Sequence, residues 1–78
     1  MNYNQYISMD PEILRGKPCI AGTRISVELI LELLSLGHSI TDILDDYPQL
    51  TQKQIFAALD FARERIHSYH APCINAGS

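Results

Sequence analysis

The pattern of apolar and polar positions is most distinctive between residues 27 and 36, VELILELLSL. Ser26 can cap the start of a helix here, and Gly37 can follow its end in a left-handed conformation. The polar side chains of the segment are spaced i, i+4 and i+7, which places them in one narrow stripe on a helix: Glu28, Glu32 and Ser35. The pattern therefore predicts a helix over residues 27–36 that is apolar on most sides.

A helix with so narrow a polar stripe is buried on most of its surface. A chain of 78 residues has few other elements to cover it, so we expect a second copy of the chain to cover part of it. The interface of this expected homodimer consists of the first helix and an apolar position of the preceding strand: Ile20, Leu29, Ile30, Leu33 and Leu36.

Two further helices are predicted closer to the C-terminus. Thr41 is expected to cap a short helix over residues 42–46. Thr51 and Gln54 match a capping box, which predicts a longer helix over residues 52–67. Its apolar stripe has helical spacing: Ile55, Ala58, Leu59, Ala62 and Ile66, with Phe56 and Phe61 beside the stripe, where they can widen the buried face.

The residues before the first helix are expected to form a small β element. Residues 6–9 and 18–21 are short pieces that predict two pairing strands. Between them, Asp10 can cap one helical turn that begins at Pro11 and ends at Gly16. The fold class predicted from the pattern is therefore mainly α, with three helices and a short N-terminal β element.

The length limits the stability that a monomer can reach. Seventy-eight residues make one domain, expected over residues 1–68, with a flexible C-terminal tail over residues 69–78. A domain of this size buries only about 60% of the surface that its unfolded chain exposes. The two cysteines, the lack of a signal-peptide pattern and the lack of a long apolar run predict a cytoplasmic protein with reduced thiols and no membrane span. Oligomerisation is then the expected stabiliser.

The charges are unevenly distributed along the chain, although the net charge is only −3. The first basic residues, Arg15, Lys17 and Arg24, follow one another with no acid between them. The next charged residues are all acidic: Glu28, Glu32, Asp42, Asp45 and Asp46. This separation indicates complementarity to another protein surface or to a second copy of the chain; the alternative is a solvated surface of mixed charge.

The two C-terminal helices have the order of a helix-turn-helix, in which the second helix reads DNA with its N-terminal side chains. The candidate DNA-binding residues are Gln52, Lys53 and Gln54. The acids of the preceding helix, Asp42, Asp45 and Asp46, weaken the attraction to phosphate that dominates DNA affinity. A plain helical hairpin is the alternative.

No catalytic constellation is recognisable, so the protein is not expected to be an enzyme. His67, His70 and Cys73 have ligand side chains, but structural zinc sites need four ligands. The glycines of the basic loop do not match the GxxxxGK[ST] phosphate-binding pattern. We therefore expect no metal and no cofactor.

Residues 10–27, DPEILRGKPCIAGTRISV, resemble the signature of domain-of-unknown-function family 433. The resemblance extends over roughly residues 7–66. It includes Gly37, the YPQLT segment at 47–51 and the apolar positions of residues 55–62.

This resemblance implies a homeodomain-like three-helix fold, similar to VapB-type antitoxins that are encoded beside a PIN-like nuclease toxin. It implies a type II antitoxin that binds the nuclease and represses its own promoter. The metal-binding carboxylates of such a nuclease would be bound by basic side chains of this chain. The candidates are Arg15, Lys17, Arg24, Arg63 and Arg65. A stand-alone DNA-binding regulator and a dimeric structural module are the alternative hypotheses.

Overall fold

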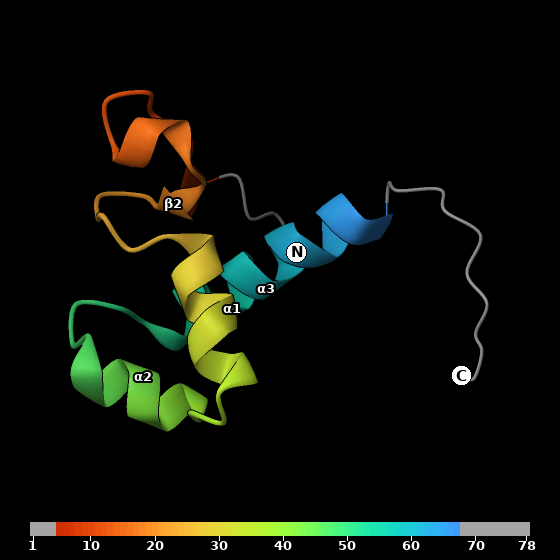
Figure 1. Cartoon of the computed structure of the whole chain (residues 1–78). Coiled ribbons are helices and arrows are strands. Elements are labelled where there is room, and N and C mark those ends of the chain that lie inside the picture. Colours follow the sequence, from red (N-terminus) through yellow and green to blue (C-terminus); the bar gives the residue numbers. More distant parts are fainter. Residues whose placement is uncertain (1–4, 68–78) are drawn as a thin grey trace.

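The computed structural model describes residues 5–67 as a mainly helical fold with a small two-stranded sheet (Figure 1). This confirms the predicted arrangement of a short β element followed by three helices. The predicted tail over residues 69–78 lies outside the described residues. In chain order, the elements are β1 (Ile7–Ser8), the 3₁₀ turn η1 (Leu14–Gly16), β2 (Cys19–Ile20), α1 (Val27–Ser35), α2 (Ile40–Asp46) and α3 (Gln52–His67).

The sheet is formed by β1 and β2, which pair antiparallel with Ile7 opposite Ile20. The segment that leads into α1 binds the other edge of β2, because Ile20 N–H donates to the Ile25 carbonyl at 2.9 Å. The Pro18 carbonyl likewise accepts from Val27 N–H at 2.9 Å. The sheet therefore fixes the entry of α1.

Two helix boundaries follow the predicted capping chemistry. At α1, the Ser26 hydroxyl accepts from Leu29 N–H at 2.9 Å, and Gly37 follows the helix with φ +97°. At α3, Thr51 N–H donates to Gln54 Oε1 at 2.8 Å, and Gln54 N–H donates to Thr51 Oγ1 at 3.3 Å. These two predictions are confirmed.

The start of α2 differs from the prediction. The helix begins at Ile40, and its cap is Ser39 instead of Thr41. Asp42 N–H donates to Ser39 Oγ at 3.1 Å, and the Asp42 carboxylate accepts from Ser39 N–H at 3.0 Å. The hydrogen bond from Ser39 lowers the pKa of Asp42. The reciprocal capping box thus gives hydrogen-bond acceptors to two backbone N–H groups, those of Ser39 and Asp42. A cap at Thr41 does not offer this.

Replacing Ser39 by alanine is expected to lower the free energy of unfolding by about 1 kcal/mol, because a cap hydroxyl is lost. Thr41→Ala is the matched control and is expected to change it by less than about 0.5 kcal/mol, since Thr41 is exposed within the helix. Urea unfolding followed by circular dichroism measures both. An equal decrease in the free energy of unfolding for the two variants would contradict the assignment of Ser39 as the cap.

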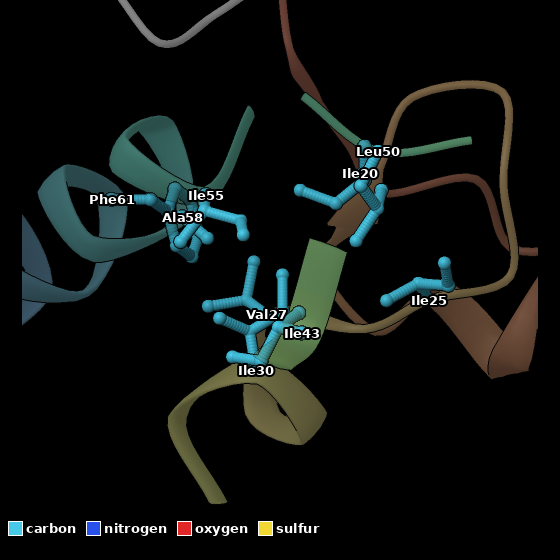
Figure 2. Close-up of a cluster of buried hydrophobic side chains, with 9 residues drawn as sticks. All are labelled: Ile20, Ile25, Val27, Ile30, Ile43, Leu50, Ile55, Ala58 and Phe61. Atoms are coloured by element: carbon cyan, nitrogen blue, oxygen red, sulfur yellow. The ribbon is translucent and has the colours of Figure 1, made fainter. Parts of the chain in front are cut away.

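The core is a cluster of buried side chains from all three helices, β2 and the segments that follow β2 and α2 (Figure 2). Its members are Ile20, Ile25, Val27, Ile30, Ile43, Leu50, Ile55, Ala58 and Phe61. α3 contributes Ile55, Ala58 and Phe61, which are spaced three residues apart and lie on one face. The first helix is therefore covered on one side by the chain's own core.

The apolar stripe predicted for α3 is wrong at its C-terminal end. Ile66 is 72% exposed, whereas Phe61 is only 6% exposed and belongs to the core. The last turns of α3 extend beyond α1, as Figure 1 shows, so the chain's own helices do not cover Ile66. Phe56, the other aromatic residue beside the stripe, is 42% exposed.

Candidate partner-binding surface

The loop between β1 and β2 has an unusual backbone conformation. Leu14, Arg15 and Gly16 all have positive φ angles, of 49°, 57° and 85°. A helical turn ended by Gly16 was expected here; the observed turn is left-handed and begins after Ile13. Asp10 still organises the loop entry, because its side chain accepts from Glu12 N–H at 2.9 Å.

Left-handed backbone costs roughly 1–2 kcal/mol at each residue with a Cβ atom. Two hydrogen bonds hold the turn: Gly16 N–H donates to the Ile13 carbonyl at 3.0 Å, and Lys17 N–H donates to the Leu14 carbonyl at 3.1 Å. Such strained conformations occur preferentially at functional sites. The turn lies at the far end of the molecule from α2 (Figure 1).

The side chains of this turn form a partly basic surface. Leu14, Arg15, Lys17 and Ser26 line a hollow of about 460 Å³, and we call Leu14, Arg15 and Lys17 the basic loop surface. Leu14 is 38% exposed, and Arg15 is exposed. Lys17 Nζ lies 3.0 Å from Glu28 Oε1 in an ion pair whose side chains are 59% and 72% exposed. Exposed pairs are weak, so Lys17 can exchange this partner for another.

The other basic candidates lie elsewhere. Arg24 is exposed on the turn between β2 and α1 and is not among the residues that line the hollow. On α3, Arg63 binds Asp60 at 3.1 Å and Glu64 at 2.8 Å, and these acids, Asp60 first, raise the pKa of Arg63. The Arg65 guanidinium lies 4.8 Å from the centre of the Phe61 ring. The fold thus brings only Arg15 and Lys17 together.

The candidate DNA-binding residues occupy the first turn of α3. Gln52 and Lys53 are exposed, whereas the Gln54 side chain is half-buried and accepts a hydrogen bond in the capping box. On the preceding helix, Asp45 and Asp46 are exposed. The first turn of α3 therefore presents two polar side chains, with acids on the neighbouring helix.

The residues expected at a homodimer interface fall into three classes. Ile20 and Ile30 are 0% exposed, because they lie in the core of the single chain. Leu29 and Leu33 are half-buried and pack against that core. Leu36 is 68% exposed. The first two side chains have no surface left for a second chain, so any interface must use other positions.

Cys19 has a structural role, as predicted. It is 2% exposed, and its thiol donates to the Lys17 carbonyl at 3.2 Å. Burial raises the pKa of Cys19, and the charge of Lys17 opposes this shift. Of the potential zinc ligands, His67 is exposed and His70 and Cys73 lie outside the described residues. Among residues 5–67, no three His, Cys, Asp or Glu side chains are grouped closely enough to hold a metal ion.

Two surface features were not predicted from the sequence. One is the left-handed turn, for which Gly16 was the only local signal, since Leu14 and Arg15 rarely adopt positive φ. The other is an apolar groove between the start of α1 and the end of α3. Its walls became recognisable only when the packing of the two helices was known. Within the described part of the chain, no helix is long and apolar enough to span a membrane.

The sequence comparison is decisive for the family. Residues 7–62 match the family described as protein of unknown function DUF433. The chain belongs to DUF433. An uncharacterized protein of Sinorhizobium fredii, y4eO, is 31% identical over 58 residues, which cover 74% of this chain and 26% of that protein.

The structural comparison agrees with this family. The crystal structure of a DUF433 member protein from Anabaena variabilis is similar with a TM-score of 0.77 and 25% sequence identity. The match covers 81% of this DUF433 chain and 62% of the other chain. The chain therefore spans about a quarter of the Sinorhizobium protein and less than two thirds of the Anabaena protein. These matches confirm the family that the sequence signature indicated.

Proposed function

We propose that this DUF433 chain is a non-catalytic antitoxin that binds and neutralises a PIN-like ribonuclease through the basic loop surface. One observation carries the proposal: a strained left-handed turn presents Arg15 and the apolar Leu14 to solvent, beside Lys17. A nuclease that holds metal with clustered carboxylates offers the complementary charge.

The residues of the turn suit different parts of such an interface. The guanidinium of Arg15 can donate two parallel hydrogen bonds to one carboxylate, which a lysine cannot do. Leu14 supplies apolar contact area next to that charge. Because backbone hydrogen bonds already fix the turn, less conformational entropy is lost on binding than for an unstructured segment.

The proposal includes a homeodomain-like arrangement of the helices, with α2 and α3 as a helix-turn-helix. It is supported by the packing of α1, α2 and α3 around one core. The connection over residues 47–51 is slightly longer than the three or four residues that are usual in a helix-turn-helix. Reading of DNA is the weaker alternative, because Gln54 is engaged in its capping box and Asp45 and Asp46 are exposed nearby. It would use Gln52 and Lys53.

Replacing Arg15 by glutamate is expected to weaken binding to the nuclease by roughly 100-fold, since reversal of a charge at an interface costs several kcal/mol. The full chain is co-expressed with the product of the adjacent reading frame, which the proposal expects to be a PIN-like nuclease, and the Kd of the purified complex is measured by calorimetry. Inhibition of RNA cleavage is measured in parallel and is expected to be lost to the same extent.

Lys53→Glu is the matched control, because it makes the same change of charge at an exposed position in the first turn of α3. An acid there is compatible with the helix dipole. This variant is expected to neutralise the nuclease normally. If the wild-type chain does not bind the adjacent nuclease, or if Lys53→Glu abolishes binding and Arg15→Glu does not, the proposal is wrong. In the second case the first turn of α3 would be the binding surface.

A further inference from the structure

An apolar groove of about 310 Å³ lies between the start of α1 and the C-terminal end of α3. Its walls are formed by Pro18, Val27 and Leu31 on one side and by Phe61, Ala62 and Ile66 on the other, with Glu28 and Arg65 also lining it. It is separate from the hollow of the basic loop surface, whose lining residues are all different. Arg15 is therefore not among the residues that line the groove.

The groove is accompanied by apolar side chains that remain in water. Leu31 is 37% exposed, and Ile66 is 72% exposed. An apolar groove and projecting apolar side chains thus occur together on one surface. Two identical chains related by a two-fold axis need this combination, because the same patch must supply both the projection and the recess.

The charged residues of the groove have the same self-complementary character. Glu28 belongs to α1, is 72% exposed and pairs with Lys17 at 3.0 Å in an exposed ion pair that can exchange its partner. Arg65 belongs to α3, where its guanidinium lies over the Phe61 ring and donates to Met9 Sδ at 3.6 Å. The patch therefore contains an acid on one wall and a base on the other. A two-fold axis between two such patches can place Glu28 of each copy opposite Arg65 of the other copy.

We propose that a second copy of this chain occupies the α1/α3 groove. Leu31 and Ile66 of each copy bury their exposed surface in the groove of the other, and Glu28 and Arg65 form two equivalent ion pairs across the axis. This assignment differs from the interface expected from the sequence, which included the buried Ile20 and Ile30. The contact does not use Leu14 or Arg15, but it draws Glu28 away from its ion pair with Lys17 of the basic loop surface.

The ion pairs allow a test with two complementary variants of the full chain. Glu28→Arg alone brings like charges together at both pairs of the homodimer, and Arg65→Glu alone does the same. Each variant is expected to raise the dimer Kd by at least tenfold. In an equimolar mixture, the arginine introduced at position 28 of one chain faces the glutamate introduced at position 65 of the other, and the remaining pair is the wild-type one. The mixture is therefore expected to form heterodimers.

Sedimentation velocity measures the species, and circular dichroism checks that each variant keeps its helices. Leu31→Glu is expected to be a folded monomer, whereas Leu36→Glu, at a 68% exposed position that does not line the groove, is expected to remain a dimer. A monomeric wild-type chain at 100 µM, roughly the concentration that a weak specific dimer requires, overturns the proposal. It is also overturned if the mixture does not restore association, or if Leu36→Glu dissociates the dimer and Leu31→Glu does not.

Discussion

Replacement of Ile30 by alanine is expected to leave little folded protein at 25 °C. Ile30 is 0% exposed and lies in the core beside Val27 and Ile43 (Figure 2). Substitution of a buried isoleucine by alanine costs about 2–5 kcal/mol, through lost transfer free energy and the cavity that remains. A core in a chain this short rarely supplies more than about 3–5 kcal/mol in total. One substitution thus removes most of the stability.

Leu36→Ala is the matched control in the residues that follow α1. Leu36 is 68% exposed, so its truncation is expected to change the free energy of unfolding by less than about 0.5 kcal/mol. Urea titration followed by the helical circular dichroism signal compares both variants with the wild type. A comparable decrease in the free energy of unfolding for the two variants would show that Ile30 does not occupy the core position assigned to it.

Ile30 and Leu36 also show what the pattern of apolar and polar residues predicts about the structure and what it does not. The near absence of polar residues in α1 correctly predicts a helix with a large apolar surface. It does not tell which apolar side chains face the chain's own core and which remain outside. That distinction depends on where α2 and α3 pack, and their positions follow from long-range contacts that periodicity does not contain. Both residues were therefore assigned to the same interface, although only Leu36 is exposed.

The capping residues illustrate a second limit. Thr51 and Gln54 were predicted because their spacing matches the preferred residue types of the capping box. Ser39 and Asp42 have the same spacing, but Asp is the shorter acid, and Thr41 is a competing cap residue within the same turn. The choice is decided by the reciprocal hydrogen bonds of Ser39, which only the folded geometry reveals.

The candidate site was predictable in charge but not in shape. Arg15 and Lys17 were selected because they follow one another without an intervening acid. Their presentation depends on positive φ angles at Leu14 and Arg15, for which residues with a Cβ atom give no local signal. Arg63 and Arg65 were selected by charge alone, yet they contact residues of their own helix. Charge therefore selected the loop that forms the basic loop surface together with positions that the fold places on α3.

Substitution of Phe61 by alanine is the second change expected to have a large effect. Phe61 is 6% exposed, so its ring is almost completely removed from water. Its removal is expected to cost about 3–5 kcal/mol, since the contacts of a whole ring are lost and a cavity is left between α1 and α3. The Arg65 guanidinium also loses the aromatic face over which it lies at 4.8 Å. Thermal and urea unfolding are expected to show a largely unfolded chain.

Phe56→Ala provides the comparison within the same helix. Both aromatic residues lie beside the apolar stripe predicted for α3, but Phe56 is 42% exposed. Its truncation is expected to cost at most about 1 kcal/mol, because it leaves little buried volume empty. A larger loss for Phe56 than for Phe61 would mean that α3 is rotated relative to the core. Such a rotation would also move Phe61 away from the α1/α3 groove, so this pair of variants tests the packing on which the dimer proposal depends.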